Sequence, residues 1–90
     1  MISVLYVDDD ESFCGFFKLY LERMDGFTVT TVRSGFKALD MILSGSFDIV
    51  VSDYHMPGMS GMDLLRAYRK KGGERSLYSL YRQGEGRGRH

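Results

Sequence analysis

Three short apolar runs, each followed by a segment with helical spacing, constrain the fold of this chain more than any other feature. The runs cover residues 2–7, 27–32 and 49–52. They are rich in β-branched residues and too short for helices, as expected of strands in a parallel sheet covered on both faces. Because strand and helix alternate with short connections, we expect right-handed crossovers. The predicted fold class is α/β.

The first predicted helix covers residues 11–24 and is closed by Asp25 and Gly26. Asp10 is suited to cap its N-terminus, because a short carboxylate accepts hydrogen bonds from the first free backbone N–H groups. We expect the aromatic stripe of this helix to lie in the core: Phe13, Phe16, Phe17 and Tyr20.

The other two predicted helices have clearer boundaries. Ser34 is expected to cap a helix that ends at Gly45. Ser60, with Asp63 three residues later, has the spacing of a capping box and opens a helix that stops at Gly72 and Gly73. On this third helix we expect the following side chains to be buried: Met62, Leu65 and Tyr68.

Composition narrows the class of protein without naming a function. The chain has 90 residues, and its 12 basic side chains offset 12 acidic ones, which gives no overall field to attract nucleic acid or an anionic membrane. The single cysteine, Cys14, cannot form an internal disulfide, and we expect it to pack as a small apolar side chain. With no secretory signal and no long apolar segment in the sequence, we expect a cytoplasmic protein.

Carboxylates follow two of the predicted strands directly. Asp8 and Asp9 come after the first strand, and Asp53 comes after the third. Parallel strands end at the same edge of a sheet, and ligands bind there at the point where the strand order reverses. If these strands are neighbours, the three carboxylates repel one another and need a cation, for which Mg²⁺ is the natural choice among oxygen ligands. A carboxylate beside Mg²⁺ can attack phosphorus and form an acyl phosphate.

Two blocks of sequence make a resemblance specific. V-D-D-D at residues 7–10 and D-Y-H-M-P-G-M-S-G at residues 53–61 resemble the response regulator receiver family of two-component signalling. The resemblance implies a flavodoxin-like three-layer sandwich with the strand order 2-1-3-4-5. It also implies that Asp53 is phosphorylated and binds Mg²⁺, that Asp9 is a direct metal ligand, and that Asp8 holds a metal-bound water. His55 would offer its backbone carbonyl to the metal.

The same resemblance implies a role in phosphorelay signal transduction. The donor would be a sensor histidine kinase or a phosphotransfer protein. Such a domain catalyses its own phosphorylation and dephosphorylation and is not a conventional metabolic enzyme. We expect no nucleic acid and no membrane among its partners.

The C-terminal half of a receiver cannot be assigned in this sequence. The family places a Thr or Ser at the end of the fourth strand and a Lys at the end of the fifth, but no Thr follows Thr31 and no Lys follows Lys71. We therefore expect a receiver fragment at residues 1–75 and an atypical basic tail at residues 76–90. The sheet would hold strands 2-1-3 with at most a makeshift fourth, and its exposed edge would favour self-association.

A reading-frame change near Arg75 would explain the tail. Codons permitted for residues 76–83 can be chosen so that a one-base shift encodes Pro-Phe-Ile-Leu-Phe-Thr-Gly-Lys, which resembles a fourth receiver strand with its switch Thr. Phosphorelay function would then be impaired by loss of the C-terminal half. The alternative is a native truncated receiver with a solvated tail.

Two other functions stay open at this point. Residues 8–12 also read D-x-D-x-S, similar to the nucleophile motif of haloacid-dehalogenase-type phosphatases, in which Asp8 rather than Asp53 would be phosphorylated. The chain could instead be a phosphate-independent module that docks a histidine kinase through its first helix and the rim of the site. Identifying the aspartate that is phosphorylated distinguishes the phosphatase alternative from a receiver. Kinase binding by Asp53→Ala, measured together with phosphate uptake, distinguishes the docking module from a receiver.

Overall fold

A computed structural model of the chain describes residues 1–45, 47–53, 56, 58–70 and 78–80, the last three by backbone only. In chain order the elements are β1 (Ile2–Val7), α1 (Glu11–Glu22), β2 (Phe27–Val32), α2 (Gly35–Ser44), β3 (Ile49–Asp53), α3 (Gly61–Lys70) and β4 (Tyr78–Leu80). No helix in this described part is long and apolar enough to cross a membrane.

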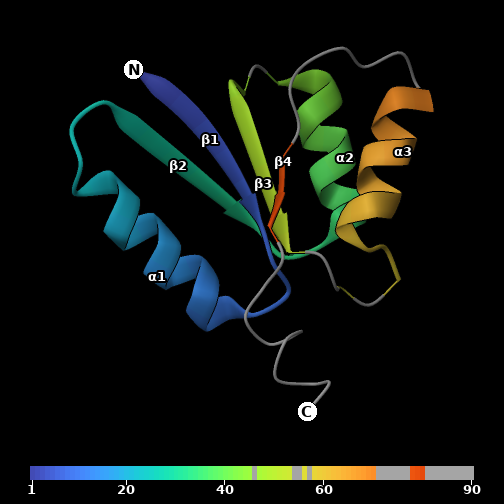
Figure 1. Cartoon of the computed structure of the whole chain (residues 1–90), viewed down its shortest axis with the longest axis horizontal. Helices are drawn as coiled ribbons and strands as arrows, with labels where there is room; N and C mark the ends of the chain where they lie inside the picture. Colours follow the sequence, from blue (N-terminus) through green and yellow to red (C-terminus); the bar gives the residue numbers. More distant parts are fainter. Residues whose placement is uncertain (46, 54–55, 57, 71–77, 81–90) are drawn as a thin grey trace.

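The strands form one parallel sheet in the order β2-β1-β3-β4 (Figure 1). The predicted parallel sheet and its order 2-1-3 are therefore confirmed. Asp48 sets the start of β3 beside β1, because its carboxylate accepts the Ser3 N–H at 2.8 Å and its own N–H donates to the Ser3 carbonyl at 2.9 Å. A short fourth strand is present, and its backbone pairs with β3 over Val51–Asp53.

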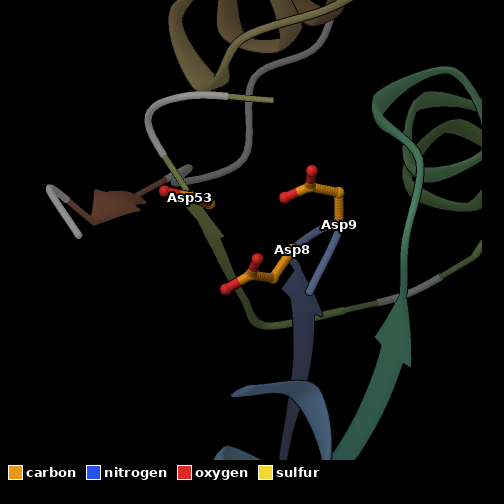
Figure 2. A group of neighbouring side chains, drawn as sticks. All are labelled: Asp8, Asp9 and Asp53. Atoms are coloured by element: carbon orange, nitrogen blue, oxygen red, sulfur yellow. The ribbon is translucent and has the colours of Figure 1, made fainter. Parts of the chain in front are cut away.

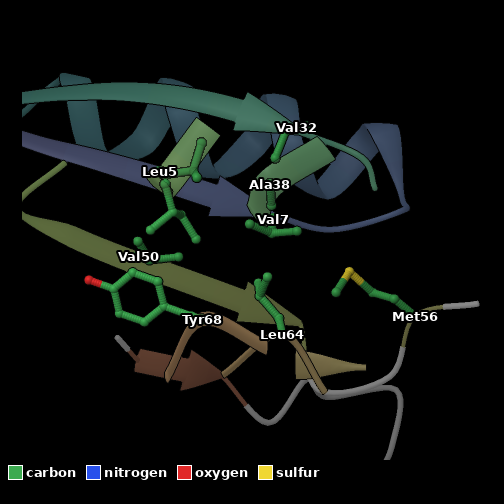
Figure 3. Close-up of a cluster of buried hydrophobic side chains, with 9 residues drawn as sticks. Leu5, Val7, Val32, Ala38, Val50, Met56, Leu64 and Tyr68 are labelled. Atoms are coloured by element: carbon green, nitrogen blue, oxygen red, sulfur yellow. The ribbon is translucent and has the colours of Figure 1, made fainter. Parts of the chain in front are cut away.

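Helices cover the two faces of the sheet unequally. α1 lies on one face, and α2 and α3 lie together on the other, which gives three layers (Figure 1). The α2–α3 side holds the larger apolar cluster (Figure 3), made of Leu5, Val7, Val32, Ala38, Ile42, Val50, Met56, Leu64 and Tyr68. The α1 side holds a smaller one, made of Val4, Tyr6, Cys14 and Val29. Successive β1 residues alternate between the two clusters, as the pleat of a strand requires.

The expectation that the aromatic stripe of α1 lies in the core is wrong for most of its residues. Phe13, Phe16 and Tyr20 are 40%, 68% and 57% exposed. The sheet instead receives a neighbouring stripe of the same helix, formed by Cys14, Phe17 and Leu21. Residues one position apart lie about 100° apart around a helix, so a shift of one position turns an apolar stripe from the sheet toward solvent.

The third helix is also rotated relative to our expectation. Leu64 is fully buried and Tyr68 is 3% exposed, while Met62 and Leu65 are only half-buried. Tyr68 was predicted correctly, but Leu64 takes the core position that we assigned to Leu65. Leu64 and Tyr68 belong to the same apolar cluster as Leu5 of β1 and Val50 of β3 (Figure 3).

The predicted N-terminal helix caps are confirmed. Asp10 accepts hydrogen bonds from the backbone of Ser12 and Phe13, and Ser34 accepts one from Lys37. At the start of α3, the Ser60 N–H donates to Asp63 at 3.1 Å and the Asp63 N–H donates back to the Ser60 hydroxyl at 3.1 Å. This reciprocal pair is the capping box expected from the sequence. At the C-terminal ends, α1 stops at Glu22 with Arg23 as its cap, before the predicted Asp25 and Gly26, and the predicted stop of α3 at Gly72 and Gly73 lies outside the described residues.

Candidate functional site

Three carboxylates meet at the edge of the sheet where β1 and β3 end. Val7 of β1 lies opposite Ser52 of β3, so the next residues, Asp8 and Asp53, leave the two strands side by side. Carboxylate oxygens of Asp8, Asp9 and Asp53 lie within 4.8 Å of one another (Figure 2). The structure thus brings together three of the four residues that we expected at the site. The fourth, His55, lies outside the described residues.

Burial differs sharply within this carboxylate cluster. Asp8 is 0% exposed and Asp53 is 1% exposed, whereas Asp9 is exposed to solvent. A buried carboxylate is costly unless donors or a cation compensate its charge, and neighbouring carboxylates add repulsion. The cluster therefore has a buried floor, made of Asp8 and Asp53, and an open side at Asp9.

Asp8 is held in place from three directions. Its Oδ2 accepts a hydrogen bond from the Tyr6 hydroxyl at 2.8 Å, and its Oδ1 accepts one from the Asp10 N–H at 2.9 Å. The Cys14 thiol donates to the Asp8 backbone carbonyl at 3.3 Å. Burial, followed by the Asp8 carboxylate, raises the pKa of both the Tyr6 hydroxyl and the Cys14 thiol, so both groups stay protonated donors at neutral pH.

The sequence reasoning missed Tyr6 as part of this site. A signal for it exists, because residues two apart on a strand point to the same face, and Tyr6 precedes Asp8 by two positions. Its apolar neighbours in β1 instead suggested a side chain of the core. Tyr6 belongs to both the core and the site, since its ring packs in the α1-side cluster while its hydroxyl donates to Asp8.

The segment after β3 supports the site through packing. Met56 is 8% exposed and joins the α2–α3 cluster. Gly58 has φ +82°, a left-handed conformation that favours glycine, and a Cβ there would lie 3.3 Å from the Phe36 ring. Met56 and Gly58, the methionine and the first glycine of the D-x-x-M-P-G-x-x-G block, are thus explained by burial and by backbone conformation.

The donor set of the cluster fits a hard divalent cation. Among the described residues, the side-chain ligand atoms of this cluster are carboxylate oxygens, and they come from two adjacent strand ends and an exposed loop residue. Mg²⁺ prefers oxygen ligands, uses few protein carboxylates and keeps several waters, which the open side at Asp9 allows.

Comparison with known proteins gives the family. Residues 4–80 match the response regulator receiver domain. The chain belongs to this family. The match includes all the strands and helices described above except the first two residues of β1.

Curated relatives of this receiver domain include a chemotaxis protein and a transcriptional regulator. The chain is 45% identical over 69 residues to the chemotaxis protein CheY of Pseudomonas aeruginosa, a match that covers 76% of this chain and 55% of the relative. It is 40% identical over 70 residues to the transcriptional regulatory protein CpxR of Escherichia coli, which covers 78% of this chain and 29% of that protein. The receiver chain thus spans about half the length of the first relative and less of the second.

Two solved structures support the receiver fold. The response regulator protein TrrA of Thermotoga maritima, in complex with Mg(2+)-BeF, is 31% identical, with a TM-score of 0.76 over 96% of this chain and 76% of that one. Another match is to a complex of the histidine kinase ThkA with TrrA, 32% identical with a TM-score of 0.75, which covers 92% of this chain and 72% of the matched one.

Proposed function

We propose that this receiver domain is a phosphoryl acceptor in a cytoplasmic two-component phosphorelay, with Asp53 as the residue that is phosphorylated by a histidine kinase or a phosphotransfer protein. The observation that carries the proposal is the position of the Asp53 carboxylate, which ends β3 within 4.8 Å of the Asp8 and Asp9 oxygens. Family membership supports it independently.

The proposed reaction is a direct transfer. An Asp53 carboxylate oxygen forms the new bond to phosphorus, while the bond from phosphorus to the donor breaks and its electron pair leaves with the donor. The product is an acyl phosphate on Asp53, which water later hydrolyses. Since β1 and β3 hold their ends in register, Asp53 is presented at a fixed place beside the other two carboxylates.

Mg²⁺ would be held by Asp9 and Asp53, with Asp8 acting through a bound water and His55 contributing its backbone carbonyl. When bound, the ion neutralises negative charge on the oxygens of the transferred phosphoryl group. Asp9 is the exposed member of the cluster and is suited to meet an ion arriving from solvent. The same charge compensation would relieve repulsion among the buried carboxylates.

Incubation with acetyl phosphate tests the proposal without a cognate kinase. We expect Mg²⁺-dependent addition of one phosphoryl group, seen by intact mass, which is lost in EDTA and in Asp53→Ala. Hydroxylamine should remove it, as expected of an acyl phosphate. The matched control is Asp40→Asn, an exposed carboxylate of α2 outside the site, which should be modified like the wild type. Equal modification of Asp53→Ala would contradict the proposal.

A second candidate function is favoured by the exposed aromatic side chains of α1. Phe16 and Tyr20 stack on each other in solvent, with ring centroids 6.3 Å apart, beside the exposed Phe13. Exposed aromatic side chains gathered on one helix face often mark a protein contact. On this basis the chain would dock a histidine kinase through α1 and the rim of the site without accepting phosphate.

Binding and phosphorylation measured together separate the two functions. If the chain is only a docking module, Asp53→Ala should bind a histidine kinase as well as the wild type does. The wild-type chain itself should then take up no phosphate. A phosphoryl acceptor would show Mg²⁺-dependent uptake, and Phe16→Ser would leave its uptake from acetyl phosphate unchanged because this side chain is 68% exposed and lies on α1.

A further inference from the structure

The Tyr6 hydroxyl reaches the floor of the carboxylate cluster from the α1 side of the sheet. Tyr6 belongs to the α1-side cluster, yet its hydroxyl donates to Asp8 Oδ2 at 2.8 Å in a buried hydrogen bond. A hydrogen bond from a neutral donor to an ionised acceptor is stronger than one between neutral groups. The bond therefore acts on the orientation of Asp8 as well as on the packing of Tyr6.

The position of this hydroxyl is fixed by its surroundings. Tyr6 is 5% exposed, and its ring stacks on Phe17 of α1 with centroids 4.1 Å apart and an interplanar angle of 11°. Phe17 packs against the α1-side cluster, which includes Cys14, and the Cys14 thiol donates to the Asp8 carbonyl. A ring confined between a strand and a helix holds its hydroxyl at one place, so the hydrogen bond costs little additional ordering.

The two oxygens of Asp8 are held by different kinds of donor. Oδ1 accepts the Asp10 backbone N–H, which belongs to the turn that begins α1. Oδ2 accepts the Tyr6 hydroxyl. A carboxylate held at both oxygens cannot rotate freely about its Cβ–Cγ bond, so these two hydrogen bonds fix the orientation of the Asp8 carboxylate.

We propose that Tyr6 is a positioning residue of this site, whose hydroxyl holds the Asp8 carboxylate in the orientation that receives the divalent cation. The inference rests on the proposed function, because it assumes that the cluster binds Mg²⁺. Groups that orient the ligands of a metal contribute to metal affinity even though they do not touch the ion. Tyr6 acts in this way through Asp8.

Tyr6→Phe tests the inference by removing only the hydroxyl. Calorimetric titration with Mg²⁺ should give a Kd about tenfold higher than that of the wild type. Tyr20→Phe is the matched control, since it removes a tyrosine hydroxyl from α1 at a residue that is 57% exposed, and its Kd should equal that of the wild type. A Tyr6→Phe Kd equal to or lower than that of Tyr20→Phe overturns the inference.

Unfolding in EDTA separates positioning from packing. A hydroxyl that only stabilises the core would lower the stability of the metal-free protein and leave the Kd for Mg²⁺ unchanged, which overturns the inference. If Tyr6→Phe does not fold, Phe17→Leu takes its place, because it removes the stacked ring and leaves the hydroxyl. Its Kd should also rise above that of Tyr20→Phe, and an equal Kd overturns the inference.

The wild-type titration distinguishes this inference from the proposed function. If the wild type binds Mg²⁺ and Tyr6→Phe binds it equally well, the role of Tyr6 is wrong and the proposed function stands. If the wild type shows no heat of Mg²⁺ binding, the proposed metal site itself is wrong, and the role of Tyr6 is overturned with it.

Discussion

Leu64 is a fully buried side chain whose removal should disturb the core. It is 0% exposed and packs in the α2–α3 cluster between α3 and the sheet (Figure 3). We expect Leu64→Ala to lower the free energy of unfolding by about 2–5 kcal/mol, because it removes buried methyl groups and leaves a cavity. Urea unfolding followed by circular dichroism measures the change.

Leu65→Ala is the matched control for this prediction. The two leucines are adjacent, but Leu65 is only half-buried, so its removal should cost clearly less. Equal losses would contradict the rotation of α3 described above, and a larger loss at Leu65 would favour the orientation that we first expected from the sequence.

Single residues of the site were predictable to different degrees. Asp8, Asp9 and Asp53 could be brought together from sequence because strand ends in a parallel sheet share one edge. The contribution of Tyr6 was harder to recognise, because its two-residue spacing to Asp8 is a weak signal and a buried tyrosine in an apolar strand satisfies the pattern of a core residue whether or not its hydroxyl has a partner. Its partner depends on the direction of the Asp8 side chain, which the pattern does not contain.

At the scale of elements, a polar network joins the end of α1 to β2. Glu22 accepts the Val29 N–H at 2.9 Å and the Lys18 ammonium at 3.1 Å, and Lys18 also donates to the Val29 carbonyl at 2.8 Å. The hydrogen bond from Val29, followed by that from Lys18, lowers the pKa of Glu22 below its ordinary value of 4.5. The network therefore favours the ionised carboxylate.

The lowered pKa predicts how stability changes with acid. Because Glu22 binds a proton more weakly in the folded chain than in the unfolded one, its contribution is present above pH 4.5 and is lost as the pH falls through the folded pKa. As the pH falls below 4.5, Glu22→Gln should therefore lose less free energy of unfolding than the wild type does. Urea unfolding at several pH values measures this loss. Asp40→Asn is the control, and an acid dependence equal in Glu22→Gln and wild type contradicts the prediction.

Elements were predicted better than the faces they bury. Strand bounds, N-terminal helix caps and the parallel order follow from short apolar runs, capping residues and chain connectivity. The buried face of α1 does not, because two apolar stripes run along this helix one position apart, and only the sheet decides which is covered. Cys14, Phe17 and Leu21 are covered, and the more aromatic stripe is left in solvent.

At the scale of the whole molecule, cation binding should be coupled to folding. The cluster joins the ends of β1 and β3 and exists only when the sheet is formed. Mg²⁺ at 100 times its Kd should therefore raise the free energy of unfolding by about 2.7 kcal/mol. Urea unfolding with and without Mg²⁺ measures this, and Asp9→Asn should show a smaller increase than Asp40→Asn. An unfolding midpoint that Mg²⁺ does not change would contradict the coupling.

The identity of residues 76–90 stays a prediction. The backbone of Leu80 lies opposite Asp53, and the Thr of the shifted reading frame would fall one position later. A fourth strand in this register would end next to Asp53, where the family places its switch Thr. Sequencing the gene and its downstream bases decides the question, since an alternate frame without a strand that ends in Lys would contradict the frame change.

The central claim is that Asp53, held beside Asp8 and Asp9, accepts a phosphoryl group. Peptide mapping of the chain after reaction with acetyl phosphate and Mg²⁺ tests it most directly. We predict that the acyl phosphate is found on Asp53 and that none forms in EDTA. Modification of Asp8 in its place would contradict the account and would favour the phosphatase-like alternative.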